Sequence, residues 1–296
     1  MNCYLYTYGL YLHTYMISYI IYSKENQSYQ LRALDFDTTG PFKDFPQVTI
    51  YHPAGQHAYS QVGWPGIVGT LTGISQEHLA ISEIGVSFPD DSFNQGVNGP
   101  FSEVVEGEPW MFVARDVLMN DKTLQDAKES ITRAKRTCNL ILGVGDGKEN
   151  RVTGVEYSGR LRPPNFYADT NLLPVNDTWH PVVENVVYNG MDWLCPTFNL
   201  KLSEQLQKYH GHIDEVTTIT NILPSLQSGS LHVAFYDLTQ LVMYVSFHRV
   251  GDSQDAPAGE PLLAYERQFT QLNMHRLFEE EPPVMNNSNP GEEMGV

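Results

Sequence analysis

Basic residues are scarce in this chain of 296 residues: 18 lysines and arginines stand against 35 acidic residues, and the formal net charge is −17. Proteins that bind the phosphate backbone of nucleic acids need clustered Lys and Arg, so this balance argues against nucleic acid as a partner. It also argues against electrostatic attachment to anionic lipid. With 41% hydrophobic and 18% charged residues, the chain can bury a large core and is expected to fold.

Cysteine is rarer still, with residues at positions 3, 138 and 195 alone. An odd number this small offers no disulfide framework, and Cys138 and Cys195 form either one pair or two buried free thiols. Asn-x-Ser/Thr sequons, which are candidate glycosylation sites and favour a secretory route, begin at Asn26, Asn176 and Asn286.

Charged residues are absent from the first 23 positions, which contain 7 tyrosines. A signal peptide needs a basic start, an apolar core and a small-residue cleavage site, and none of these is evident. The segment is long enough to span a membrane, but each tyrosine hydroxyl would need a partner in the hydrocarbon, so no stable span is expected. The alternation of Tyr4, Tyr6 and Tyr8 favours an edge strand, and residues 1–15 otherwise form an atypical leader.

The length of the chain suits one large domain or two small ones, and a single domain over residues 16–276 is expected. No long linker, internal repeat or low-complexity block interrupts this range. Residues 277–296 are acidic, rich in Pro, Asn and Gly, and nearly free of large apolar side chains. They are expected to form a solvated, disordered tail.

Regular alternation of strands and helices is missing from the middle of the chain. Short β-branched or apolar runs predict strands over residues 29–36, 47–53, 66–74 and 79–86. Helical spacing of apolar residues predicts helices from Pro109 and over 123–134, the second capped by Asn120 or Asp121. A hairpin over 138–157, helices over 202–226 and a hairpin over 231–247 follow. This segregated order predicts an α+β fold of antiparallel sheets between helices.

Familiar catalytic and cofactor motifs are also missing. There is no Gly-x-Ser-x-Gly elbow, and Gly143-Val-Gly-Asp-Gly147 leads into a strand and lacks the third glycine of a dinucleotide loop, so it is interpreted as a turn. The histidines do not fall into metal-ligand spacing with an acidic ligand. Paired acids at 35/37 and 90/91 are typical of turns. No metal or cofactor is therefore expected.

Two charged residues stand within an otherwise apolar predicted strand. Arg32 lies between Leu31 and Ala33, and Asp35 follows three residues later. Strand alternation places Arg32 on one face and Asp35 on the other, unless the strand ends or bulges there. Because a buried charge is costly without a partner, these residues are either a structural pair or part of a functional site.

The sequence around these charges resembles that of a known family. Leu31-Arg-Ala-Leu-Asp-Phe36 is similar to the Gly-Arg-Asn-x-Asp-(Phe/Trp) strand of the cysteine N-terminal-nucleophile (Ntn) hydrolases, which include penicillin acyltransferase, acid ceramidase and choloylglycine hydrolase. Further resemblances follow in the family's order, namely a hairpin over 69–82, a helix pair from 115, a hairpin over 139–156 and a Thr-Asn-x-x-Pro turn over 170–174. In overall character the chain is most similar to acid-ceramidase-like secreted proteins.

The resemblance implies an αββα sandwich of two antiparallel sheets and the hydrolysis or transfer of an N-acyl amide, lipid-like or small, without a cofactor. In such enzymes an N-terminal Cys freed by self-cleavage attacks the amide, with its own amine as base. Arg32 would orient the thiol and the substrate, and Asp35 would hold the terminal amine. Asn171 would donate its amide to the oxyanion, with Asn189 as the fallback. The implied location is secreted or lysosome-like, and the oligomeric state is left open.

The nucleophile of the family is not found at its place. Its position, about 16 residues before Arg32, holds Met16, whose thioether cannot form a thiolate, and Cys3 lies too far upstream. The chain is then either an enzyme whose functional start differs near residue 16, or a catalytically silent relative that binds a ligand or partner. A third hypothesis is an unrelated all-β binding module, in which Arg32, Asp35 and Asn171 would not be neighbours.

Overall fold

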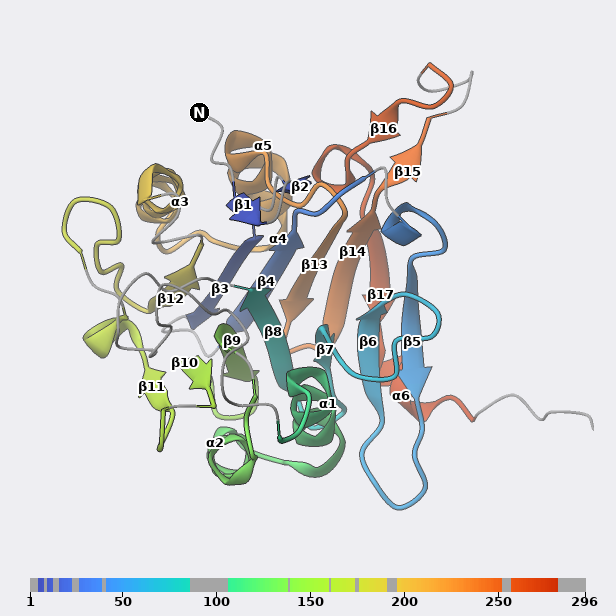
Figure 1. The fold of residues 1–296 in the computed structure, drawn as a ribbon, viewed down its shortest axis with the longest axis vertical. Coiled ribbons are helices and arrows are strands. Elements are labelled where there is room, and N and C mark those ends of the chain that lie inside the picture. Colours follow the sequence, from blue (N-terminus) through green and yellow to red (C-terminus); the bar gives the residue numbers. More distant parts are fainter. Residues whose placement is uncertain are drawn as a thin grey trace, which may run out of the picture.

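The structure is a sandwich of two antiparallel sheets between two layers of helices (Figure 1). The computed structural model describes residues 5–7, 10–12, 16–22, 27–38, 41–85, 106–137, 139–159, 161–173, 176–190, 196–251 and 257–281. Helices α1 and α2 cover the outer face of one sheet, and α3 to α5 cover the other. The predicted α+β class and the αββα order of layers are confirmed.

The sheet that carries position 16 has six strands in the order β12-β3-β4-β13-β14-β17. Their bounds are Val186–Asn189, Met16–Tyr22, Ser28–Leu34, His232–Asp237, Val242–Phe247 and Thr270–Asn273. Every side chain of β4 is buried, because helices cover one face of the sheet and the second sheet covers the other. Polar residues of β4 therefore lie inside the protein and need partners there.

The second sheet has five strands in the order β11-β10-β9-β8-β7. Their bounds are Asn165–Tyr167, Arg151–Ser158, Asn139–Asp146, Leu79–Gly85 and Thr72–Ile74. A hairpin of β5 (Gln47–Tyr51) and β6 (Tyr59–Gly63) joins this layer through a bridge from Tyr59 to Ser75. The strand predicted over 66–74 is shorter than expected, since only β7 is extended there.

Two further two-stranded sheets are not paired with either main sheet. β1 (Leu5–Thr7) pairs with β2 (Leu10–Leu12), so the strand expected near Tyr4–Tyr8 exists but belongs to a separate two-stranded sheet. β15 (Arg249–Val250) pairs with β16 (Pro261–Leu262). Within the described ranges, no helix is long and apolar enough to cross a membrane.

The first helical block is α1 (Trp110–Asn120) and α2 (Leu124–Arg133). The cap expected at Asn120 or Asp121 is wrong, because Thr123 caps α2. Its hydroxyl accepts from the Asp126 N–H at 3.1 Å, and the Asp126 carboxylate accepts from the Thr123 N–H at 3.1 Å. This reciprocal capping box satisfies two N–H groups that no helical carbonyl reaches.

The second block comprises α3 (Pro196–Lys208), α4 (Glu215–Thr217), a π-helical turn over Thr218–Ile222 and α5 (Leu223–Leu226). The expected interruption occurs at Gly211, whose φ of +80° lies in the left-handed region that glycine adopts freely. A final helix, α6, spans Met274–Glu279, so residues 277–279 of the predicted tail are helical. Residues 282–296 of that tail lie outside the described part.

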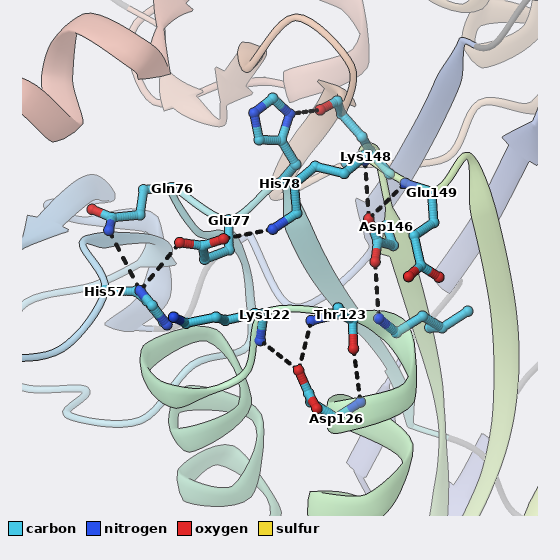
Figure 2. A network of polar contacts seen from close by, with 12 residues as sticks. His57, Gln76, Glu77, His78, Lys122, Thr123, Asp126, Asp146, Lys148 and Glu149 are labelled. Carbon is cyan, nitrogen blue, oxygen red and sulfur yellow. Dashed lines mark hydrogen bonds and ion pairs between the residues drawn. The ribbon is translucent and has the colours of Figure 1, made fainter.

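A polar network ties the start of α2 to the turns of the five-stranded sheet (Figure 2). The Asp146 carboxylate accepts the Leu124 N–H at 2.9 Å and the Lys148 N–H at 2.9 Å. The Glu77 carboxylate accepts from Lys148 Nζ at 2.5 Å. The network lies far from position 16, since the neighbouring His78 contacts the Leu238 carbonyl beside the beginning of β4. Its role is therefore to join helix and sheet.

Candidate functional site

Arg32 is the one cation of the predicted site, and it is buried. It lies in the middle of β4, and 2% of its surface is exposed. Arg32 Nη2 is 3.1 Å from Glu83 Oε2, and Arg32 Nε donates to the Glu83 carbonyl at 3.3 Å. Arg32 Nη1 lies 2.6 Å from His232 Nε2. The ion-pair partner of Arg32 is therefore Glu83 of the other sheet.

The electrostatics of this cluster are dominated by burial. Burial lowers the pKa of Arg32 and raises the pKa of Glu83, and each charge opposes the shift of the other. The pKa of His232 lies well below its ordinary value because the ring is buried and, secondly, because it faces the Arg32 guanidinium. His232 is thus a neutral ring beside an ion pair.

Asp35 lies just past the end of β4 and faces away from Arg32, as strand alternation predicts. Its Oδ2 accepts from the Ser228 hydroxyl at 2.6 Å. Its Oδ1 accepts the N–H groups of Gly229 at 2.8 Å and Ser230 at 2.6 Å. Burial raises the pKa of Asp35 to about 6, although these hydrogen bonds favour the carboxylate. Asp35 anchors the loop between α5 and β13, and its expected contact with a terminal amine stays a prediction.

Asn189 lies in the same row of the six-stranded sheet as Arg32. Asn189 pairs with Ser18 of β3, and Ser18 pairs on its other side with Arg32. Asn189 Oδ1 accepts from the Tyr167 hydroxyl at 2.7 Å, and its Nδ2 donates to the Leu173 carbonyl at 3.2 Å. A carboxamide therefore stands one strand beyond β3, level with the guanidinium of Arg32.

Asn171, the first choice for the oxyanion donor, lies elsewhere. It closes a 3-10 turn over Asp169–Asn171, is exposed, and accepts the Ala168 N–H at 2.8 Å. It lines a groove with Lys128 and Arg151, and neither Arg32 nor Asp35 belongs to that groove. The expectation that Asn171 joins Arg32 and Asp35 is not met, whereas the fallback Asn189 lies in the row of Arg32, two strands away in the sheet.

The backbone pairing of β3 shows where position 16 lies in the six-stranded sheet. Met16 is the first residue of β3 and pairs with Leu34, which pairs with His232. Position 16 therefore lies in the row of His232, two residues along β3 from Ser18, which pairs with Arg32. The Met16 side chain lies outside the described part, as do Asn26, Asn286 and all three cysteines. Asn176 lies in a turn, where its Oδ1 accepts the Thr178 N–H at 2.9 Å.

Two members of the cluster, Glu83 and His232, escaped the sequence analysis. A lone acid within the apolar run Leu79–Gly85 was a usable signal, because a buried carboxylate calls for a buried cation. His232 follows Leu231 at the start of a strand and has no comparable signal. Within the described ranges, no three His, Cys, Asp or Glu side chains gather in a group that could hold a metal ion.

A cavity of about 790 Å³ lies on the helix side of the six-stranded sheet, away from this cluster. Tyr29, Tyr244, Asp214, Glu215 and Asp237 are among the residues that line it. Burial and then the charge of Asp237 raise the pKa of Tyr29 above its ordinary value. The cavity is acidic and belongs to the opposite end of β4 from Leu34.

Comparison with known proteins finds both relatives in sequence and neighbours in fold. No family model matches the chain. Protein dcd1A of Dictyostelium discoideum is 34% identical over 262 residues, which cover 84% of this chain and 56% of that protein. Protein dcd1B of the same organism is 29% identical over 267 residues, which cover 86% of this chain and 50% of that protein. The chain thus spans about half the length of these relatives.

Solved structures with the same arrangement are more distant in sequence. The N-acylethanolamine-hydrolyzing acid amidase ortholog of Caenorhabditis elegans aligns with a TM-score of 0.57 at 17% identity, covering 86% of this chain and 99% of that chain. A mutant of the conjugated bile acid hydrolase from Clostridium perfringens aligns with a TM-score of 0.53 at 9% identity, covering 87% of this chain and 96% of that chain. At these identities the likeness concerns the fold.

Proposed function

Since the chain has the fold of the Ntn hydrolases, we propose that its site at the start of β3 recognises a linear N-acyl amide, lipid-like or small. We further propose that the amide is cleaved when position 16 carries a thiol. With Met16 the chain binds such an amide without cleaving it, because a thioether supplies neither a proton nor a thiolate. The two neighbours named above are described as hydrolases of N-acylethanolamines and of conjugated bile acids.

The observation that carries the proposal is the placement of Arg32. A buried guanidinium, held by Glu83 and His232, belongs to a residue that pairs with Ser18, two residues along β3 from position 16. A guanidinium presents several donors in a rigid plane, so it can orient a thiolate or a carbonyl oxygen that lies beside it. Because the site is buried, such a fixed cation acts more strongly than it would in water.

The chemistry with a thiol at position 16 follows the logic of an activated nucleophile. The sulfur attacks the acyl carbon while the terminal amine takes the thiol proton. The negative oxygen that develops is stabilised by fixed donors, for which Asn189 is the better placed carboxamide. The C–N bond then breaks, the leaving amine takes the proton, and water hydrolyses the thioester.

The test is the Met16→Cys variant of the full chain. We expect mass spectrometry to show cleavage of the peptide bond that precedes position 16, and a panel of fluorogenic acyl amides of different chain length to show hydrolysis. Met16→Ala is the matched control, which keeps the fold but supplies no sulfur. The proposal fails if folded Met16→Cys protein neither self-cleaves nor hydrolyses any amide, and if calorimetry detects no amide binding to the Met16 chain.

We also propose a secreted or lysosome-like location, as the resemblance implies. What supports this is the sequon at Asn176, which lies in a turn and is partly accessible. Expression in a eukaryotic host should give a protein whose mass falls on enzymatic deglycosylation, and Asn176→Gln should reduce that fall. A chain that stays inside the cell without glycan would contradict this location.

A further inference from the structure

We propose that His232 is a positioning residue for Arg32: its neutral ring, with the proton on Nδ1, accepts a hydrogen bond from Arg32 Nη1 and fixes the plane of the guanidinium beside position 16. The hydrogen bond itself does not depend on the proposed function. The catalytic consequence does rest on it, because Arg32 matters for cleavage only if the site cleaves an amide.

The roles of the two nitrogens follow from the chemistry of the partners. A guanidinium has donors and no acceptor, so the His232 Nε2 that lies 2.6 Å from Arg32 Nη1 must accept. The single proton of the neutral ring is then on Nδ1. Glu83 holds the other side of the guanidinium through contacts to Nη2 and Nε. His232 and Glu83 together leave the guanidinium one orientation.

The ring of His232 is itself locked in place. None of its surface is exposed, and the Trp64 ring lies at 5.6 Å between centroids, tilted by 38°. The Phe247 ring approaches edge-on at 6.2 Å. Because His232 opens β13 opposite Leu34, the locked ring belongs to the row of position 16. The positioning group and the reacting position therefore share one row of the sheet.

The other ring nitrogen of His232, Nδ1, indicates that this residue does more than fill space in the core. Nδ1 of His232 is buried and finds no hydrogen-bond partner within the described part of the chain. A buried donor without an acceptor destabilises the fold, and an apolar side chain of similar shape would avoid that cost. An apolar side chain would also remove the acceptor that His232 Nε2 offers to Arg32 Nη1. The imidazole of His232 provides an acceptor nitrogen, Nε2, which Leu or Phe at this position would lack.

The first arm of the test needs no activity. In the Met16 chain labelled with ¹⁵N-histidine, long-range NMR spectra should show His232 as the Nδ1–H tautomer without protonation between pH 5.5 and 8, its signals assigned by their loss in His232→Gln. Replacing Arg32→Met together with Glu83→Leu removes the donor and leaves no unpaired charge. His232 should then change its tautomer balance, while His180, equally buried and bonded to the Tyr188 carbonyl at 2.9 Å, should not.

The second arm uses kinetics in the Met16→Cys background. His232→Gln supplies an acceptor oxygen and should keep kcat within a few-fold, whereas His232→Leu should lower kcat about 100-fold with little change in KM, as for a misplaced catalytic group. His180→Leu is the control for loss of a buried ring and should leave kcat unchanged in the folded fraction.

The outcomes separate the two proposals. An Nε2–H tautomer, an unchanged His232 spectrum after removal of Arg32, or equal losses of kcat in His232→Gln and His232→Leu would overturn the positioning role. If Met16→Cys cleaves no amide, the proposed function fails, and the NMR arm alone then decides whether His232 positions Arg32.

Discussion

The hydroxyl of Tyr167 donates a hydrogen bond to the carboxamide oxygen of Asn189 across 2.7 Å, and this bond joins the two sheets beside the site. With the oxygen held in this way, the amide nitrogen of Asn189 is the donor end of the carboxamide, and it donates to the Leu173 carbonyl at 3.2 Å. Its partner Tyr167 is fully buried in the five-stranded sheet, and Asn189 is the last residue of β12. The hydrogen bond from Tyr167 therefore fixes the orientation of the Asn189 carboxamide.

Asn189 rather than Asn171 should matter for catalysis. In the Met16→Cys background, Asn189→Ala is expected to lower kcat about 100- to 1,000-fold, as the loss of one oxyanion donor does. Asn171→Ala, which removes an exposed carboxamide from a turn, should change kcat by less than a few-fold. Steady-state kinetics on one acyl amide measures both. A larger loss in Asn171→Ala would return the role to the residue indicated by the family resemblance.

The Arg32–Glu83 pair should dominate the stability of the site. Glu83→Leu leaves a buried guanidinium without its counter-charge and should lower the free energy of unfolding by about 3–5 kcal/mol. Lys135→Met, which removes one partner of the exposed pair with Glu106, should cost less than about 1 kcal/mol. Urea denaturation followed by circular dichroism compares them. Equal costs would show that burial does not strengthen the pair.

Asp35 should make stability fall as the pH rises from about 4 to about 6. Its pKa is about 6 in the folded protein against an ordinary value of 3.8, so the folded state holds the proton more tightly over this range. Relative to Asp35→Asn, the wild type should lose up to about 3 kcal/mol of unfolding free energy across it. Urea denaturation at each pH measures this. Leu226→Ala, a nearby apolar truncation, is the control and should lower the free energy of unfolding equally at pH 4 and at pH 6. If the wild type and Asp35→Asn showed the same dependence of unfolding free energy on pH, the effect would be refuted.

Gly154 should be intolerant of a side chain. A Cβ built at Gly154 in β10 would collide with ring atoms of Tyr167. Gly154→Ala is therefore expected to lower the free energy of unfolding by about 1–3 kcal/mol, as overpacking does, and to disturb the contact of Tyr167 with Asn189. Gly63→Ala, whose Cβ would meet the amide nitrogen of Gln61 at 3.1 Å and no nearer atom, should cost less. Thermal denaturation compares the two variants. Equal stability of Gly154→Ala and Gly63→Ala would contradict this prediction.

Local patterns in the sequence predicted the strand that carries Arg32 and the helices of the first helical block. The alternation over residues 29–36 predicted β4 and the opposite directions of Arg32 and Asp35, and both are confirmed. Helical spacing after Pro109 predicted α1 and α2, although the cap is Thr123. Strands β6 and β12 were not predicted. β6 is the second strand of a hairpin with β5, and β12 has four residues and is extended by its pairing with the distant β3. The family resemblance predicted the layers, which the fold confirms.

The partner of Arg32 could not be predicted in the same way. Glu83 is 51 residues away in the chain and His232 is 200 residues away, and each meets Arg32 because separate strands pack together. The same holds for Asn189, which the pairing of β12 with β3 brings level with Arg32, while Asn171 is held by its own turn.

By itself, then, the sequence determined the strand that holds Arg32, the face each of its charges takes, the helices that cover the sheets, and the absence of a thiol at position 16. Those features follow from the repeat of the backbone over a few residues and from the chemistry of single side chains. Only the tertiary structure decided that Glu83 neutralises the Arg32 guanidinium, that His232 accepts a hydrogen bond from it, and that Asn189 lies in its row of the sheet. Contacts of this kind arise from packing across the whole domain, which brings buried polar groups from distant segments of the chain within reach of one another.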